Sequence, residues 1–394
     1  MSKYEILSKI ICMFLLISSI TLKAQIPAND PAWIRQDADH GTDEFNTSGV
    51  VSSKWYKCYP WNCGTYSITS GAEVNLAANI IWNTGDTTVK ILADTLTTWV
   101  HIAPSDFDTI PANGVDYAYS GGILWRKQYD FGSGPVDIYK NGYVEILAKY
   151  PTGVYPIWPA FWLFGQGDCT DGTYLNDYKI EIDIAENWPK VTVAGDSIGT
   201  NVHLSDWASC DYIGSDNMKE IGTGFTLSSD FHKYACEWGP DRIIWYVDDA
   251  VVRSIYDPAG TTVPQHAMSV LFNMSLATDV TYLPANWNAF EHHPKEPTNW
   301  PQYFEIAYLR YYKLDLDCST DLTLSSTSYD RKVKKTITTS ASSTLNFNPS
   351  SPSASYTLRG TDAVTIAAPT GGNSVTINPS STGYFAIQTM ECPY

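Results

Sequence analysis

The sequence has few basic residues relative to acidic ones and lacks long apolar runs, and both features narrow the classes of function that are possible. Its 394 residues include 25 Lys and Arg against 42 Asp and Glu, which gives a formal net charge of −17. Such acidity argues against nucleic acid or an anionic membrane as a partner. No stretch of 18 or more apolar residues follows the N-terminal region. We therefore expect neither nucleic-acid binding nor membrane insertion.

The first 24 residues have the pattern of a signal peptide. Lys3 and Lys9 precede a short apolar run over residues 10–20, and Ala24 places a small residue before Gln25. Basic residues, a short apolar run and a small residue in this order are typical of a secretory signal. We expect residues 1–24 to be removed and the protein to be secreted or displayed at the cell surface. No cysteine closely follows the apolar run, which argues against a lipid anchor.

The cysteines are expected to be structural. An exported chain permits disulfides, and the expected pairs are Cys58–Cys63, Cys169–Cys210 and Cys318–Cys392. Cys236 lies in a strand-like run and is expected to be a buried free thiol. No spacing of cysteine and histidine resembles a zinc site, so we predict no metal centre.

Helical periodicity is scarce, and strand patterns recur instead. Alternation of apolar and polar residues marks four segments, and turn signals such as Gly239-Pro240-Asp241 separate them. Many short strands without intervening helices predict an antiparallel sandwich. We assign this domain to residues 25–315. The four segments are residues 143–148, 180–184, 242–247 and 304–312.

The composition changes after Cys318. Residues 316–394 are rich in Ser and Thr, and no Trp occurs among them. Short alternating segments about ten residues apart, each ended by Gly or Pro, predict a small stacked β module. A flexible tail is the alternative. The module resembles the short β-stack modules that end secreted proteins of Bacteroidota, which implies a role in sorting or surface display.

Three carboxyl groups lie within six residues, at Glu181, Asp183 and Glu186. In a regular strand Glu181 and Asp183 face one side, whereas Glu186 faces the other. One extra residue, a β-bulge near Ile184 and Ala185, would return Glu186 to the side of the other two. Glycosidic hydrolysis needs two carboxyl groups flanking one bond. Asp183 between them would push their pKa values apart, so that one stays ionised and the other protonated.

The alternative for this segment is an acidic strand on a solvated face, and the upstream tryptophans argue against it. Trp158 and Trp162 share strand parity with Ala160, whereas Phe161 and Leu163 point the other way. Sugar rings stack on indole rings, so a face with two indoles suits a binding site for sugar. Core packing is the alternative for each tryptophan.

Together these stretches resemble glycoside hydrolase family 16. The sequence Glu-Ile-Asp-Ile-Ala-Glu at residues 181–186 has the E-x-D-x-x-E form with the bulge residue, which laminarinases and marine galactanases share. Further segments match the family in the expected order: Asp43–Asn46 with Lys54-Trp55, Tyr119–Gly122 with Trp125-Arg126, Gly142–Glu145, residues 231–248, and Tyr308–Tyr312.

The resemblance implies a β-jelly roll (concanavalin-like) of two curved antiparallel sheets with an open cleft. It also implies a retaining double displacement with Glu181 as nucleophile, Glu186 as acid/base and Asp183 as the assisting carboxylate. Trp158 and Trp162 would line the cleft. His203 would contact the substrate near the leaving-group side. Weaker candidates for substrate contact are Trp125, Arg126, Trp188 and Trp207.

The resemblance implies no required cofactor. Many relatives hold a structural calcium through an aspartate in the last strand. The aligned position here is Ala307, which argues against calcium in this chain.

We predict a secreted, monomeric, endo-acting retaining glycosidase whose partner is a β-linked polysaccharide, with a β-1,3-glucan of the laminarin type as the leading substrate. A galactanase acting on agar, porphyran or carrageenan is the alternative within the family, although a sulfated polymer would favour a basic cleft. A non-catalytic lectin on the same fold is the alternative of another class, because function depends on the site rather than the scaffold. The complete carboxylate triplet argues against the lectin.

Overall fold

The structure is a computed structural model of the chain. It describes residues 28, 33–38, 40–46, 54–59, 67–68, 72–82, 86–102, 115–126, 129–130, 134–135, 139, 141–151, 156–166, 179–187, 196–205, 212–215, 218–239, 242–257, 262–264, 267–276, 300–314, 316–324, 333–339, 345–347, 356–365, 375–377 and 385–389.

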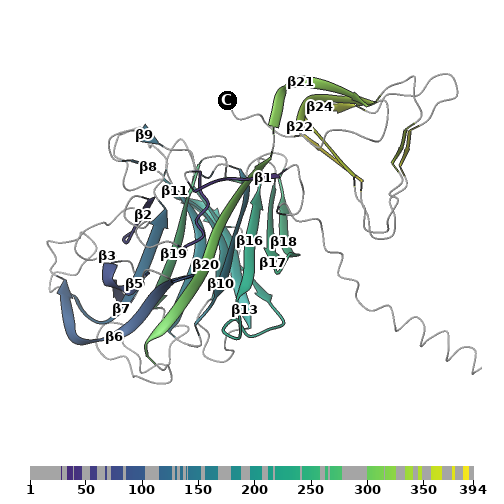
Figure 1. Cartoon of the computed structure of the whole chain (residues 1–394). Helices are drawn as coiled ribbons and strands as arrows, with labels where there is room; N and C mark the ends of the chain where they lie inside the picture. The colour runs from purple at the N-terminus through teal and green to yellow at the C-terminus, as the bar shows by residue number, and fades with distance from the viewer. Residues whose placement is uncertain are drawn as a thin grey trace, which may run out of the picture.

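One layer of the sandwich, here called the front sheet, contains the acidic segment. In the view of Figure 1 this layer lies behind the other one. The neighbouring strands given below pair antiparallel. In spatial order they are β2 (Trp55–Tyr56), β7 (Val115–Arg126), β19 (Ser269–Leu276), β11 (Ile157–Gln166), β12 (Lys179–Glu186) and β13 (Ser197–Ser205), with β14 (Tyr212–Ser215) and β15 (Lys219–Gly222) both beside β13.

The other layer, here called the back sheet, is also antiparallel. Its strands in order are β5 (Ile80–Ile81), β6 (Val89–Ile102), β20 (Gln302–Leu314), β10 (Gly142–Lys149), β16 (His232–Trp238), β17 (Arg242–Val247) and β18 (Ala250–Tyr256), with β1 (Trp33–Arg35) along the end of β20. Pairing of β6 with β7 joins the two sheets. The predicted antiparallel sandwich is therefore confirmed, and it is an all-β jelly roll.

The core lies between the two sheets and explains the alternation in the sequence. Phe161 and Phe272 of the front sheet and Ile146 and Phe304 of the back sheet are all fully buried in one cluster. Burial of this apolar surface is the main stabilising contribution. The free thiol of Cys236 is buried in the same cluster, as predicted. The other cysteines' partners lie outside the described side chains, so the disulfide pairs stay predictions.

Short elements complete the jelly-roll domain. Parallel pairing places β4 (Glu73–Asn75) beside β7. The others are β3 (Ser67–Ile68), β8 (Tyr129–Asp130), β9 (Gly134–Pro135) and the 3-10 turn η2 (Ala77–Asn79).

The C-terminal region forms parallel sheets. In one, the order is β21 (Leu316–Leu324), β22 (Val333–Thr339), β24 (Tyr356–Thr365) and β26 (Phe385–Thr389); in the other, β23 (Leu345–Phe347) pairs with β25 (Val375–Ile377). The boundary between this module and the jelly roll stays a prediction.

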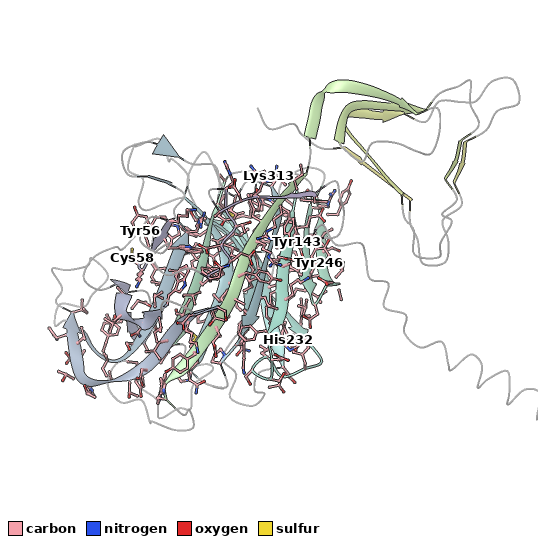
Figure 2. The ribbon with its side chains drawn as sticks, in the orientation of Figure 1. Tyr56, Cys58, Tyr143, His232, Tyr246 and Lys313 are labelled. Carbon is pink, nitrogen blue, oxygen red and sulfur yellow. The ribbon has the colours of Figure 1, made fainter. Side chains whose placement is uncertain are left out.

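Tyrosines cover the outer side of the back sheet. Tyr143 and Tyr246 lie side by side there, with ring centroids 5.6 Å apart (Figure 2). The Tyr143 hydroxyl donates to Glu145 Oε2 at 3.1 Å. Burial raises the pKa of Glu145, and the charge of Lys233 opposes this effect. Glu145 is thus a buried carboxyl group of the sheet opposite the acidic segment.

The predicted β-bulge is present in β12. Between Asp183 and Glu186 the strand advances three residues, whereas the facing strand β13 advances two, from Asn201 to Gly199. The pairing with β11 shifts by one residue at the same place. A bulge leaves part of the hydrogen-bond ladder unmade, so the nearby carbonyl groups need other donors.

Two side chains on the core side supply those donors. The Trp245 Nε1–H of β17 donates to the Asp183 carbonyl at 2.9 Å, and the Tyr150 hydroxyl donates to the Ala185 carbonyl at 2.7 Å. Both side chains are at most 1% exposed. The back sheet, through Trp245, therefore helps to hold the bulge in the front sheet.

Replacement of Tyr150 by phenylalanine tests this contact. Tyr150→Phe leaves a buried carbonyl without a donor, so we expect the free energy of unfolding to fall by about 1–3 kcal/mol. Chemical denaturation followed by tryptophan fluorescence measures this change. Tyr256→Phe is the matched control, because Tyr256 is 71% exposed and its hydroxyl is solvated. Equal stability of the two variants would contradict the assignment.

Among the described residues, no helix has the length and apolar character needed to cross a membrane.

Candidate active site

The bulge brings the three predicted carboxyl groups to the same face of the front sheet. Ile182, Ile184 and Ala185 enter the core instead. The carboxyl groups differ in exposure: the side chain of Glu181 is 23% exposed and that of Asp183 is 2% exposed, whereas Glu186 is 8% exposed. Three carboxyl groups on one strand thus have three different environments.

Glu186 has the environment of a protonated acid. Burial raises its pKa well above the usual value, and the negative charge of Asp183 raises it further. The Trp158 Nε1–H donates to Glu186 Oε1 at 3.0 Å, which opposes the shift by stabilising the charged form. The pKa of Glu186 is therefore raised, whereas its separation from the pKa of Glu181 stays a prediction.

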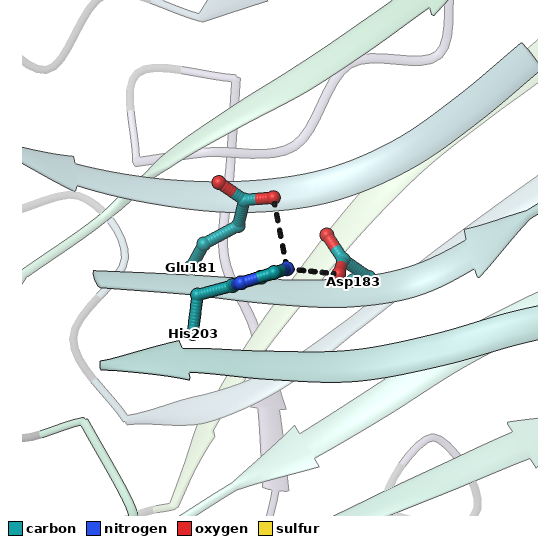
Figure 3. A group of neighbouring side chains, drawn as sticks. All are labelled: Glu181, Asp183 and His203. Atoms are coloured by element: carbon teal, nitrogen blue, oxygen red, sulfur yellow. Dashed lines mark ion pairs between the residues drawn. The ribbon is translucent and has the colours of Figure 1, made fainter. Parts of the chain in front are cut away.

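His203 lies beside the other two carboxyl groups (Figure 3). It pairs with Glu181 across β12 and β13. Its Nε2 lies 3.3 Å from Asp183 Oδ2 and 3.8 Å from Glu181 Oε1. His203 is therefore next to the predicted nucleophile. Its substrate contact stays a prediction.

The Asn201 amide lies beside the Nε2 atom of this histidine. Asn201 Nδ2 lies 2.9 Å from His203 Nε2, while the buried Asn201 Oδ1 has no partner among the described atoms. Turning the amide over would let Oδ1 accept from Nε2–H, which also faces two carboxylates. The ligand atoms of Glu181, Asp183 and His203 lie within 4.8 Å of one another, a spacing that could also hold a metal ion.

The predicted orientation of the tryptophan run is confirmed. Phe161 and Leu163 are in the core, whereas Ala160 and Trp162 pack together on the face of the carboxyl groups. Trp162 pairs with Asp183 in the sheet register. Its ring is 8% exposed, and its Nε1–H donates to Asn273 Oδ1 at 2.7 Å. Trp158 is more exposed and contacts Glu186.

Trp125 shares this face but is covered. The Tyr56 ring stacks on it with centroids 4.9 Å apart, and Trp125 is 3% exposed. Tyr59 packs in the same cluster. The segment from Tyr56 to Tyr59 therefore covers part of the face that the sequence assigned to sugar.

The structure contradicts the predicted substrate contact of Arg126. It follows Trp125 in a strand and therefore points to the opposite side, where it is 1% exposed. Its guanidinium lies 5.4 Å from the centre of the Trp55 ring and donates to the Ala38 carbonyl. A side chain so placed contacts the protein interior rather than a sugar. Trp188 and Trp207 lie outside the described residues.

Several polar residues near the site were missed. Asn273 and Ser275 alternate with Phe272 and Met274 in β19, so two polar side chains in an otherwise apolar strand were a usable signal. The Asn273 amide donates to Ser275 Oγ at 2.9 Å. Tyr59 and Glu73 approach the same place from short segments whose sequence gives no comparable signal.

Two further features lie outside the acidic face. A cavity of about 370 Å³ is lined by Arg35, Asp37, Glu44 and Lys54, among others, away from β12. The site is therefore identified by its chemistry and not by this cavity. Ala307, at the family's calcium position, offers no side-chain oxygen as a ligand.

The structure thus places three carboxyl groups and two indoles on one sheet face of an antiparallel jelly roll. The model of the glycosyl hydrolases family 16 matches residues 121–299, which contain β12 and the tryptophan run. This match confirms, over residues 121–299, the resemblance to the family that the motifs predicted.

Individual relatives agree with this assignment. Glucan endo-1,3-beta-glucosidase A1 of Niallia circulans is 27% identical over 214 residues, which cover 52% of this chain and 27% of that protein. A beta-1,3-glucan-binding protein of Tenebrio molitor is 33% identical over 122 residues, which cover 31% of this chain and 24% of that protein. The chain thus spans about a quarter of the length of either relative.

Similarity to solved structures supports the fold. The crystal structure of porphyranase B from Zobellia galactanivorans matches with a TM-score of 0.50 at 18% identity, covering 72% of this chain and 94% of that one. At this identity the likeness concerns the jelly roll alone.

Two substitutions should shift the pKa of Glu186 in opposite directions. Asp183→Asn removes a negative charge, so we expect the pKa of Glu186 to fall. Trp158→Phe removes the hydrogen bond to the carboxylate, so we expect it to rise further. Carbon-13 NMR titration of the labelled glutamate carboxyl groups measures both shifts against the unsubstituted protein. Shifts of the same sign would contradict the described environment.

Proposed function

We propose that this chain is a secreted, retaining endo-glycosidase that hydrolyses a β-1,3-linked glucan. The observation that carries the proposal is the unequal environment of two carboxyl groups on one strand. Burial and Asp183 favour the protonated form of Glu186, whereas Glu181 is more exposed and lies near the His203 imidazole. One acid and one nucleophile on the same face are what hydrolysis with retention needs.

The proposed reaction has two steps. In the first, Glu186 gives its proton to the glycosidic oxygen while the Glu181 carboxylate attacks the anomeric carbon, so the glycosidic bond breaks and a glycosyl ester forms. In the second, Glu186 takes a proton from water, whose oxygen attacks the same carbon and releases Glu181. Asp183 contributes by its charge, which keeps Glu186 protonated before the first step. These steps consume one water and need no cofactor.

The substrate class rests on the relatives. Both curated relatives have names that specify β-1,3-glucan. The net charge of −17 disfavours a sulfated polymer such as porphyran or carrageenan. The signal-peptide pattern of residues 1–24 supports export, where such polymers are found. We propose that the protein acts there as a monomer.

A second candidate is a glucan-binding protein without turnover. The similarity to the Tenebrio molitor protein favours it, because that relative is named for binding. A binding protein has no need for a carboxyl group held protonated beside a second one, and burial of a carboxyl group costs free energy. The pair of Glu181 and Glu186 therefore favours the hydrolase.

Product analysis tests the proposed function. The protein would be incubated with laminarin, lichenan, agarose, porphyran and carrageenan, and we expect short oligosaccharides from the β-1,3-glucan. Glu181→Gln and Glu186→Gln should each lower the rate by about 10²–10⁴-fold or more. Proton NMR of the first product should show the β-anomer, as retention requires.

Glu220→Gln is the matched control, because Glu220 is an exposed glutamate of the front sheet in β15. It should hydrolyse at the unsubstituted rate. Glucan binding without release of any oligosaccharide, unchanged in Glu181→Gln and Glu186→Gln, would overturn the hydrolase and establish the binding protein.

A further inference from the structure

A chain of hydrogen bonds leads away from Trp162 along the face of the front sheet. Trp162 Nε1–H donates to Asn273 Oδ1 at 2.7 Å, and Asn273 Nδ2 donates to Ser275 Oγ at 2.9 Å. The Tyr59 hydroxyl lies 3.2 Å from the same Ser275 oxygen. These residues are all at most 8% exposed.

The direction of this chain follows from the donors. An indole nitrogen can only donate, so Asn273 must present its oxygen to Trp162 and its nitrogen to Ser275. Ser275 Oγ therefore accepts from Asn273, and its own proton must go elsewhere. All hydrogen bonds of this series therefore point the same way, from Trp162 through Asn273 to Ser275 and beyond it.

Glu73 lies on that far side. It is fully buried, and its Oε2 accepts the Leu276 backbone N–H at 2.8 Å, one residue beyond Ser275. Its Oε1 has no hydrogen-bond partner among the described atoms. The Ser275 hydroxyl is close enough to lower the pKa of Glu73. The unpartnered oxygen is therefore an available acceptor for the Ser275 proton.

Close packing fixes Glu73 in this position. A Cβ atom added at Gly121 would lie 2.8 Å from Glu73 Cγ and 2.2 Å from the Met274 carbonyl oxygen. The neighbouring Asn75 is 1% exposed, and its side-chain amide is also close enough to lower the pKa of Glu73. A buried polar group without a hydrogen bond lowers the stability of the folded state. A hydrogen-bond network with a fixed direction is one reason why such groups are kept.

We propose that Glu73 is a positioning residue, which in its ionised form accepts the Ser275 proton and thereby fixes the Trp162 indole beside Asp183. When Glu73 is protonated, its own O–H can donate to Ser275 Oγ in competition with the Asn273 amide. The hydrogen bonds of the series then no longer all point the same way. The effect on catalysis rests on the proposed function, whereas the effect on Trp162 does not.

The switch between the two forms falls near neutral pH. Burial raises the pKa of Glu73 from 4.5 to about 7, although the hydrogen bond from Leu276 opposes the shift. The titratable groups that face it are Tyr59 and Tyr117, and burial raises the pKa of each above its usual value, so both stay neutral. Glu181 acts on Tyr59 as a further negative charge. The Trp162 indole should therefore be most firmly held above pH 7.

Tryptophan fluorescence tests the position of Trp162 directly. The signal of Trp162 is the difference between the protein and its Trp162→Phe variant, measured from pH 5 to pH 9. We expect this difference to titrate with a midpoint near 7, and the titration to be absent in Glu73→Gln. Persistence of the titration in Glu73→Gln would overturn the proposal, whether or not any glucan is hydrolysed.

Kinetics on a glucan oligosaccharide give the second readout. At pH 8 we expect KM of Glu73→Gln to be several-fold above that of the unsubstituted enzyme with kcat little changed, because the glutamine mimics protonated Glu73. At pH 5.5 the two proteins should have equal KM. Glu145→Gln, which changes a buried carboxyl group of the back sheet, should match the unsubstituted enzyme at both pH values. A KM ratio independent of pH would mean a structural role only and overturn the proposal.

Discussion

The site depends on one local irregularity, the β-bulge in β12, and on the hydrogen bonds that hold it. A regular strand would turn Glu186 toward the core, where an acid could not reach a substrate. The bulge frees backbone carbonyl groups in the buried interior of the sandwich, and Trp245 and Tyr150 donate to them. Arg253 reinforces this region, since it packs on the Trp245 ring and donates to Thr200 of β13. The two sheets are thus coupled at the place where the chemistry is assembled.

Burial then gives neighbouring carboxyl groups different properties. Glu186 is desolvated and lies near the charge of Asp183, and both effects favour the protonated form of its carboxyl group. Glu181 retains solvent contact and lies near the His203 ring. Water exclusion strengthens each of these interactions relative to the surface of the protein. The same strand can therefore supply an acid and a nucleophile without a metal ion or a cofactor in the proposed reaction.

Much of this arrangement could be predicted from local pattern. The strands, the face of the tryptophans and the bulge all follow from alternation with a period of two, since a one-residue insertion is visible as a change of parity. Arg126 was assigned wrongly because its neighbour Trp125 was assigned to the same site, although adjacent strand residues face opposite sides. The parallel pairing of the C-terminal strands was not predicted, because alternation alone does not distinguish parallel from antiparallel neighbours.

Contacts between distant segments account for the rest. Glu73 meets the backbone of Leu276 across 203 residues of sequence, and Tyr59 meets Ser275 across 216. Such contacts are set by the three-dimensional path of the chain, and short strands such as β4 carry too few residues for a pattern. The polar chain from Trp162 to Glu73 therefore became visible only in the structure.

Trapping of the covalent intermediate tests the central claim most directly. A β-1,3-glucan oligosaccharide that carries fluorine at carbon 2 and a fluoride leaving group slows the second step more than the first, so a glycosyl ester should accumulate. Mass spectrometry of the intact protein and of its peptides would locate the label. We expect one added glycosyl group on Glu181. A label on another carboxyl group, or turnover of this reagent with inversion and no label, would contradict it.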